Sequence, residues 1–364
     1  MASLTDQHGP KRCKDDGPIR VLIVDDVKSA RDLLTDILGT DRRFQVVGAL
    51  SDGREAVEAA MRLQPDLITM DIRLPGLDGF LAVEQILAQF TVPIVMITAS
   101  LSDPKEKLFQ ALNAGALDVL DKQELYLWRT RPEVRNSFLR RLRTLASTRL
   151  RPVPVRAPAG HEGHRAHMQP SVETGELPFM VVIASSTGGP SALMSLLKEI
   201  PAGVNAAFLV VQHMSPGFLE GLARWLDSEV ELTVKKAEHG DPLKPGVALL
   251  APEDYHMLVT DDGLIRLNKS LPIGGHRPSA EVLFDSVSHY YGTRGIGIVL
   301  TGMGSDGASG LKRLRARGAH TIAQDEETSI VFGMPRAAID LGAAEMVLPL
   351  EKIAPQLMAW ISKG

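Results

Sequence analysis

A serine stands near the middle of the chain, where an apolar run gives way to a glycine-rich turn. Residues 179–183 are apolar, and Ser185, Ser186 and Thr187 precede two glycines and Pro190. The apolar run predicts a buried strand, and Pro190 suits the first turn of a helix. A hydroxyl between them would lie beside free helix N–H groups, which is a suitable place for a nucleophile. A helix cap is the plainer alternative, and a phosphate-binding turn is a third, although the glycines fit neither common phosphate motif.

An imidazole and a carboxylate follow two other predicted strands in the same half of the chain. The apolar run 206–211 leads to His213, and the run 295–300 leads through a Thr-Gly-Met-Gly turn to Asp306. Parallel strands place their carboxyl ends at one edge of a sheet, so both side chains are expected near Ser186. A serine hydrolase needs these three groups, because the imidazole takes the serine proton and the carboxylate orients the imidazole.

The order of the three groups also bears on the fold. They occur as Ser, His and Asp, and the serine does not lie in a G-x-S-x-G sequence. The α/β-hydrolase fold has the order Ser, Asp, His and normally carries that motif. We therefore predict a different doubly wound sheet, with N–H groups of the turn at 301–304 available to stabilise an oxyanion.

In the first half of the chain, five polar residues stand at the ends of predicted strands. They are Asp25, Asp26, Asp71, Thr98 and Lys122. Clustered carboxylates need a cation, and oxygen ligands beside a phosphoryl group favour Mg²⁺. One carboxylate could then attack a phosphoryl donor, with the lysine and the hydroxyl binding phosphoryl oxygens. Each aspartate taken alone would instead be interpreted as a turn or cap residue.

The elements that must position these groups alternate between strand and helix in both halves. This alternation predicts two doubly wound parallel α/β sheets, at 19–124 and 179–364. Between them, 125–178 is predicted to contain a basic connecting helix at 132–148 and a flexible linker rich in Pro, Gly and Ala. A DNA-binding element is the alternative for the helix, but no second helix completes a helix-turn-helix. His161, His164 and His167 could contact a metal, although a histidine-bearing linker is the simpler interpretation.

Composition excludes several classes of protein. The chain has 364 residues and a net charge of −4, so it lacks the overall basic charge of a nucleic-acid-binding protein. Its single cysteine, Cys13, excludes an internal disulfide framework and a cysteine-based zinc site. Residues 1–18 lack the apolar segment of a secretion signal, and no run is long enough to span a membrane. We expect a cytoplasmic protein without membrane insertion.

The first half resembles the receiver domain of two-component response regulators, which has a flavodoxin-like fold. The resemblance rests on Val-Asp-Asp at 24–26, Met-Asp-Ile-Arg-Leu-Pro-Gly-Leu-Asp-Gly at 70–79, Thr-Ala at 98–99 and Asp-Val-Leu-Asp-Lys at 118–122. It implies that a chemotaxis histidine kinase is the phosphodonor for Asp71. It also implies that Asp25, Asp26 and Asp71 hold Mg²⁺ and that Thr98 and Lys122 sense the phosphoryl group. Gln123 departs from the family, which commonly has proline there.

The second half resembles the catalytic domain of the chemotaxis protein-glutamate methylesterase (CheB) family. The matching motifs are Ala-Ser-Ser-Thr-Gly-Gly-Pro at 184–190, Gln-His-Met-Ser-Pro-Gly-Phe at 212–218, His-Arg-Pro-Ser at 276–279, Leu-Thr-Gly-Met-Gly-Ser-Asp-Gly at 300–307 and Val-Phe-Gly-Met-Pro-Arg at 331–336. The resemblance implies that Ser186 is the nucleophile, His213 the base and Asp306 the orienting acid. It assigns the oxyanion N–H to Met303.

Two positions depart from the family pattern. Ser185 replaces an alanine and introduces a second serine, which ranks below Ser186 because only Ser186 directly precedes Thr-Gly-Gly. Glu281 stands where the family usually has aspartate.

The two resemblances together imply a phosphorylation-activated carboxylesterase without a cofactor in its catalytic domain. It would hydrolyse glutamate γ-methyl esters on chemoreceptor cytoplasmic domains, release methanol and deamidate receptor glutamines. The unphosphorylated receiver would cover the active site. A response regulator whose second domain only binds a partner is the alternative from another class, and a transcription factor is a weaker one.

Overall fold

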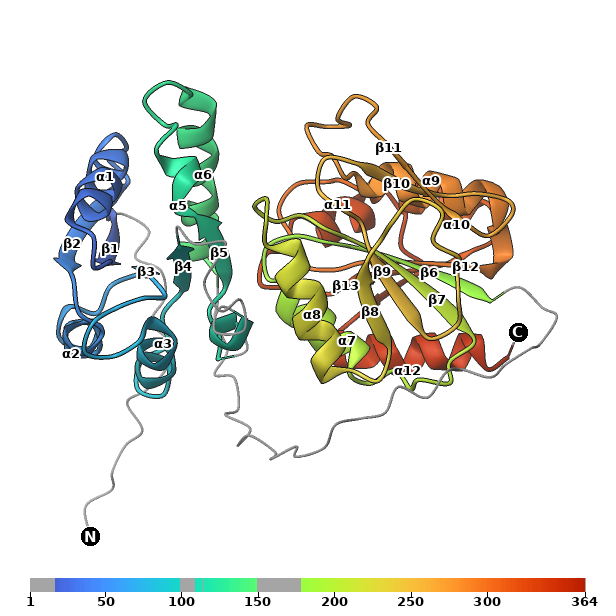
Figure 1. Cartoon of the computed structure of the whole chain (residues 1–364), viewed down its shortest axis with the longest axis horizontal. Coiled ribbons are helices and arrows are strands. Elements are labelled where there is room, and N and C mark those ends of the chain that lie inside the picture. The colour runs from blue at the N-terminus through green and yellow to red at the C-terminus, as the bar shows by residue number, and fades with distance from the viewer. Residues whose placement is uncertain (1–16, 99–108, 113, 149–177, 364) are drawn as a thin grey trace, which may run out of the picture.

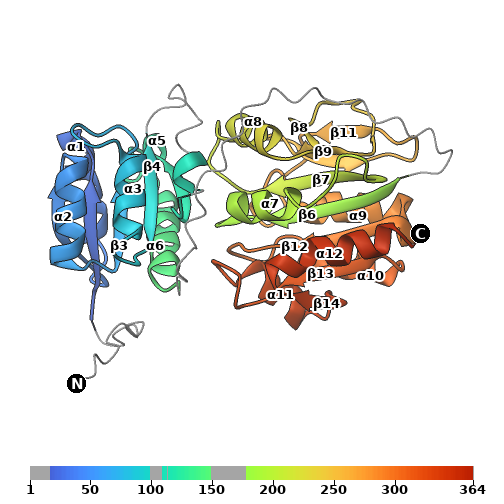
Figure 2. The ribbon, with the colours of Figure 1, turned by 90° about the horizontal axis from the view of Figure 1, so that it is seen from below.

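The computed structural model describes residues 17–98, 109–112, 114–148 and 178–363. Within these ranges the chain forms two large parallel sheets, which Figures 1 and 2 show as two units side by side. We call them the N-terminal unit and the C-terminal unit. The predicted doubly wound α/β architecture is confirmed for both. No helix in the described ranges combines the length and the apolar character needed to cross a membrane.

The N-terminal unit is a five-stranded parallel sheet in the order β2-β1-β3-β4-β5. Its strands are β1 (Ile19–Val24), β2 (Phe44–Leu50), β3 (Leu67–Met70), β4 (Ile94–Thr98) and β5 (Asp118–Asp121), and helices α1 (Lys28–Gly39), α2 (Gly53–Leu63), α3 (Gly79–Leu87) and α5 (Lys122–Leu125) connect or follow them. In β1, Leu22 and Val24 pack with α2 and α3, whereas Val21 and Ile23 pack with α1. Both faces of the sheet are therefore buried, which explains the continuous apolar runs in the sequence.

Helix α6 (Pro132–Ala146) covers the same face of this sheet as α1. Its apolar stripe, Phe138, Leu139, Leu142 and Leu145, is buried in one cluster with α1 and β1. Two hydrogen bonds of 2.5 Å from the Arg141 guanidinium to Asp118 fasten it to β5. The sequence-based expectation places this helix in the linker, whereas its packing makes it part of the N-terminal unit. The predicted flexible segment 151–178 lies outside the described residues except for its last one, and so do His161, His164 and His167.

The C-terminal unit is a seven-stranded parallel sheet in the order β14-β13-β12-β6-β7-β9-β8. Its strands are β6 (Phe179–Ser185), β7 (Ala206–Gln212), β8 (Thr233–Lys236), β9 (Val247–Leu250), β12 (Gly295–Val299), β13 (His320–Gln324) and β14 (Met346–Leu348). Its helices are α7 (Gly189–Leu197), α8 (Leu219–Glu229), α9 (Ala280–Tyr290), η1 (Gly292–Arg294), α10 (Ala308–Ala316), α11 (Met334–Asp340) and α12 (Leu350–Ile361), and an antiparallel hairpin of β10 (His256–Val259) and β11 (Ile265–Asn268) lies outside the sheet.

The direction of winding reverses between β6 and β12. The chain proceeds from β6 to β7 on one side, and it returns later to place β12 on the other side of β6. The carboxyl ends of the two strands are adjacent, since Ala184 pairs with Val299 and its carbonyl accepts a 2.9 Å hydrogen bond from the N–H of Leu300. Sites in open α/β sheets form at such a switch point. Ser186 and the 301–306 turn both lie at this switch point, just after β6 and β12.

The two units contact each other through side chains on both sides. The ring of Phe109 stacks on Trp225 of α8 with centroids 5.3 Å apart, and the Ser191 hydroxyl of α7 donates to the Leu112 carbonyl at 3.4 Å. Val331 of the C-terminal unit is buried in the cluster formed by β1, α1 and α6, and Met303 packs against that cluster. The N-terminal unit therefore lies against the same part of the C-terminal unit that carries the 301–306 turn.

Candidate functional site

Ser186 lies on a tight turn between β6 and α7. Its N–H donates to the Thr301 carbonyl at 3.1 Å, which joins the turn to the end of β12. Gly188 adopts a φ of 76°, a left-handed conformation that favours glycine, and α7 begins directly afterwards. Ser186 is half-buried. The turn therefore exposes one serine at the switch point, beside a helix N-terminus.

Ser185 faces the interior instead. It is fully buried, and its hydroxyl donates a 2.6 Å hydrogen bond to the Gln212 side-chain oxygen. The Gln212 amide nitrogen donates to the carbonyls of both Ser186 and His213 at 2.8 Å. A Cβ at Gly189 would lie 2.0 Å from the Gln212 oxygen, so this amide occupies the space that the glycine leaves. Ser185 thus contributes to a buried network that fixes the two neighbouring turns.

His213 directly follows β7 and faces Asp306, with 3.0 Å between Nε2 and Oδ2. Asp306 also accepts hydrogen bonds from the Ser279 hydroxyl at 2.6 Å and the Ala280 N–H at 2.7 Å, at the start of α9. Burial alone would raise the pKa of Asp306, but His213 and these donors outweigh it and lower the pKa. Asp306 is therefore held ionised beside the imidazole.

The orientation of the His213 ring decides which nitrogen can serve a serine. Because Nε2 lies 3.0 Å from the carboxylate, Nδ1 is the remaining nitrogen. Both nitrogens are buried, and neither makes a hydrogen bond of good geometry to a described residue. In the familiar serine protease arrangement the two nitrogens have the opposite roles.

Glu281 holds the other side of the Asp306 loop. Its Oε1 accepts from the N–H groups of Gly307 and Ser309, at 3.1 and 3.0 Å, and Oε2 contacts Arg313 at 2.9 Å. Burial raises its pKa. Asp306 thus binds the N-terminus of α9 while Glu281 binds the N-terminus of α10. The sequence marks Glu281 only as a departure from a family pattern, and its capping role depends on the packing of α9 against α10.

His276 stacks on His213, with ring centroids 4.2 Å apart and an angle of 6° between the planes. Burial lowers the pKa of His276, and the neighbouring His213 lowers it further. The sequence analysis assigns no role in the site to His276. The only signal for it in the sequence is its place at the start of the His-Arg-Pro-Ser motif.

The 301–304 turn approaches Ser186 through a glycine. A Cβ at Gly302 would lie 2.8 Å from Ser186 Cβ and 2.4 Å from Met334 Sδ, so only glycine fits. The N–H of Met303, the next residue, has no acceptor among the described residues. A cavity of about 180 Å³ lies beside His213, and its walls also include Met214, Glu253, His276 and Arg277. A small carbonyl group could enter it.

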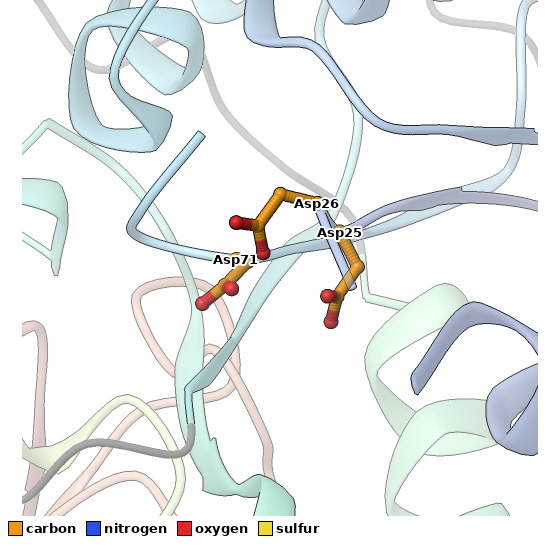
Figure 3. A group of neighbouring side chains, drawn as sticks. All are labelled: Asp25, Asp26 and Asp71. Carbon is orange, nitrogen blue, oxygen red and sulfur yellow. The ribbon is translucent and has the colours of Figure 1, made fainter. Parts of the chain in front are cut away.

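The N-terminal unit gathers its own cluster at the carboxyl ends of β1 and β3. Figure 3 shows Asp25, Asp26 and Asp71 as neighbouring side chains, and one oxygen from each lies within 4.8 Å of the others. Lys122 Nζ lies 2.6 Å from an oxygen of Asp25 and 2.6 Å from one of Asp71. This hard oxygen donor set fits Mg²⁺.

Burial sets the charge state of this cluster. It raises the pKa of Asp25, and it raises that of Asp71 to about 6 despite the nearby ammonium group. Burial would lower the pKa of Lys122, but the two carboxylates outweigh it and raise that pKa. The lysine is therefore a cation that compensates two buried acids.

The remaining predicted receiver residues also lie at this edge. Thr98 ends β4 and is buried, and it pairs in register with Asp121 of β5. Gln123 lies in the short helix α5, where its N–H donates to the Asp121 carboxylate at 2.8 Å. The bond preceding Gln123 is trans. The structure thus brings Lys122 into direct contact with Asp25 and Asp71, with the Asp26 carboxylate beside them.

Comparisons with known proteins assign both units to families. The response regulator receiver domain matches residues 21–125, and the CheB methylesterase family matches residues 181–357. A protein-glutamate methylesterase/protein-glutamine glutaminase of Symbiobacterium thermophilum is 38% identical over 95% of this chain and 98% of its own length. One from Anaeromyxobacter dehalogenans is 41% identical over 93% of this chain and 96% of its own length. The CheB methylesterase catalytic domain of Thermotoga maritima is similar to the C-terminal unit, with 42% identity, a TM-score of 0.49 and coverage of 50% of this chain and 98% of that one.

Proposed function

The chain belongs to the CheB methylesterase family and carries a receiver domain, and on that premise we propose that it is a phosphorylation-activated protein-glutamate methylesterase. Its substrates would be glutamate γ-methyl esters on the cytoplasmic domains of chemoreceptors, and a chemotaxis histidine kinase would be its phosphodonor. The observation that carries this proposal is the contact of His213 with an ionised Asp306 at the switch point where Ser186 is exposed.

In the proposed reaction, Ser186 Oγ attacks the ester carbonyl carbon while His213 Nδ1 takes the serine proton. The bond from carbon to the methoxy oxygen then breaks, and the imidazolium returns the proton so that methanol leaves. Water, activated by the same imidazole, cleaves the acyl-enzyme to glutamate and free serine. With a glutamine substrate the leaving group is ammonia, which accounts for a deamidase activity at the same site.

The oxyanion that forms on the carbonyl oxygen would be bound by the N–H of Met303. Support comes from the close approach of Gly302 to Ser186 and from the lack of another acceptor for that N–H in the described part of the chain. A preorganised donor of this kind typically contributes about 2.7–4 kcal/mol to transition-state stabilisation.

In the receiver, Asp71 would be the phosphorylated residue, and Asp25, Asp26 and Asp71 would hold Mg²⁺. The bound metal would neutralise negative charge on the phosphoryl oxygens. Lys122 already reaches both Asp25 and Asp71, so its ammonium is placed to bind a phosphoryl oxygen, and the Thr98 hydroxyl would bind another. Phosphorylation would thereby replace the present pairing of Lys122 with two carboxylates.

Asp71→Asn is expected to abolish stimulation by a small-molecule phosphodonor such as acetyl phosphate, because the nucleophile for the phosphoryl group is lost. Methanol release from methylated receptor membranes should rise with phosphodonor and Mg²⁺ for the wild type. The variant should remain at the unstimulated rate. A variant that is still stimulated would show that the phosphoryl group acts elsewhere. No release from the wild type in any condition would instead favour the alternative in which the second domain only binds a partner.

The contact between the two units suggests how phosphorylation would control the site. Met303 packs against the cluster of β1, α1 and α6, so the receiver would cover the active-site edge until phosphorylation shifts the population away from the closed arrangement.

Phe109→Ala is expected to raise the unstimulated rate roughly two- to ten-fold. It removes the stack on Trp225, and aromatic pairs are worth about 0.5–1.5 kcal/mol beyond the area that they bury. The rate with phosphodonor should change little, because the closed arrangement is already depopulated. Phe44→Ala is the matched control, since Phe44 is a buried phenylalanine of β2, at the opposite edge of the receiver sheet from β5. Equal effects of both variants would mean that receiver instability, rather than the contact, raises the rate.

A further inference from the structure

The loop between β11 and α9 carries two exposed apolar side chains. Leu271 is 84% exposed and Ile273 is 46% exposed. Among the large hydrophobic residues in the described ranges, Leu271 has the largest exposed fraction. We call residues 269–278 the rim loop. Single exposed apolar residues are common on protein surfaces, so exposure alone does not indicate a binding surface.

The backbone of the rim loop is fixed by hydrogen bonds from neighbouring side chains. The Arg277 guanidinium donates to the carbonyls of Lys269 and Ser270, at 3.4 and 3.1 Å. The carbonyl of Leu271 accepts from Nε2 of His256, at 3.1 Å, while Nδ1 of this buried histidine accepts from the Ser279 N–H at 3.2 Å. Three successive carbonyls are thus held by side chains. The exposed leucine therefore stands on an anchored backbone.

The rim loop is also joined directly to the active site. Ile273 and His276 exchange two backbone hydrogen bonds of 3.0 and 2.9 Å around Gly274 and Gly275. Both glycines have positive φ, at 59° and 88°, as a two-residue hairpin turn requires. His276 in turn stacks on His213. Ile273 is therefore paired through its backbone with His276, and the His276 ring contacts His213, the proposed catalytic base.

We propose that the rim loop is the docking surface for the helix that carries the esterified glutamate, with Leu271 and Ile273 as its apolar anchors. This inference rests on the proposed function. The γ-carbonyl of a glutamyl residue lies only a few bonds from its backbone, so a helix that delivers it to the proposed nucleophile and base must lie close to His213, which lines the cavity. Gly275, His276 and Arg277 line that cavity and belong to the rim loop.

The geometry favours a helix over an extended peptide as the occupant. The facing backbone groups of Ile273 and His276 already bind each other, and Arg277 and His256 occupy the carbonyls of residues 269–271. Little backbone is left to pair with an added strand. What the rim loop offers is apolar side chains, which suit the apolar face of an amphipathic helix.

The test compares a large and a small substrate on the full-length protein. The variant is Leu271→Ser combined with Ile273→Ser. The control is Val347→Ser, an apolar residue as exposed as Ile273, on strand β14 at the edge of the sheet. The substrates are a methyl-esterified chemoreceptor cytoplasmic fragment and the small ester N-acetyl-glutamate γ-methyl ester α-amide. Methanol release gives kcat and KM for each.

We expect the double variant to raise KM for the receptor fragment about ten-fold, as loss of apolar anchors does in other interfaces. The small-ester rate should be unchanged, and the control should match the wild type on both substrates. An unchanged KM for the fragment overturns the docking proposal. An equal loss on both substrates also overturns it, because the loop would then only support His276. Hydrolysis of the small ester but not of the fragment by the wild type would overturn the proposed substrate itself, and hydrolysis of neither would overturn the hydrolase assignment.

Discussion

Ser186→Ala is expected to lower methanol release by about 10⁶-fold, to the level that the oxyanion donor and binding alone provide. On the turn between β6 and α7, Ser186 is the one hydroxyl-bearing residue that is not buried, so no neighbouring hydroxyl can replace it as the nucleophile. Ser185 is the only competitor in the sequence, and its hydroxyl is buried and donates to Gln212. The variant should fold normally, because Ser186 is only half-buried and the substitution removes a single oxygen atom.

Ser185→Ala is the matched control for this prediction. It removes one buried hydrogen bond, so it should lower stability by about 1 kcal/mol and change the rate only slightly. The reverse result, with Ser185→Ala inactive and Ser186→Ala active, would assign the nucleophile to Ser185. If both variants kept full activity, a serine-dependent mechanism would be excluded. Labelling by a serine-directed fluorophosphonate, located by mass spectrometry, provides an independent readout.

Much of the site could be predicted because its residues stand at strand ends. The apolar runs before Ser186, His213 and Asp306 identify buried parallel strands, and a parallel sheet brings such ends to one edge. The same argument places Asp25 and Asp71, which follow β1 and β3 and meet in one cluster. No knowledge of side-chain packing is needed for either prediction.

Other features depend on packing that a single sequence does not encode locally. The apolar stripe of α6 predicts a buried helix face, but both a linker helix and a sheet-covering helix would show it, and only the structure assigns it to the receiver. His276 lies far from His213 in the chain, and the stack between them depends on the hairpin at Gly274 and Gly275. The short strands β8 and β14 lie at the sheet edges. Strand β8 contains two lysines and lacks a continuous apolar run, and strand β14 is apolar but only three residues long, so neither gives a clear strand pattern in the sequence.

The position of the carboxylate relative to the imidazole leads to the second large effect. Asp306 accepts hydrogen bonds on both oxygens, from the Ser279 hydroxyl on Oδ1 and from the Ala280 N–H on Oδ2, and His213 Nε2 lies 3.0 Å from Oδ2. A carboxylate can accept all of them. An asparagine can keep its oxygen toward the Ala280 N–H and Nε2 and turn its amide N–H₂ toward the Ser279 hydroxyl, but it carries no charge to stabilise the imidazolium that forms when His213 takes the serine proton.

Asp306→Asn is therefore expected to lower kcat by about 10⁴-fold, with little change in KM, since the uncharged amide no longer stabilises the imidazolium and the substrate contacts are unaltered. Glu281→Gln is the matched control. It changes the neighbouring acid that caps α10 while leaving the Asp306 carboxylate in place, so it should reduce activity far less. Thermal unfolding of all variants separates a chemical loss from a folding defect. If Asp306→Asn retained activity within about ten-fold of the wild type while folding normally, the carboxylate would be a cap for α9 rather than the orienting acid, and His213 would act as a base without it.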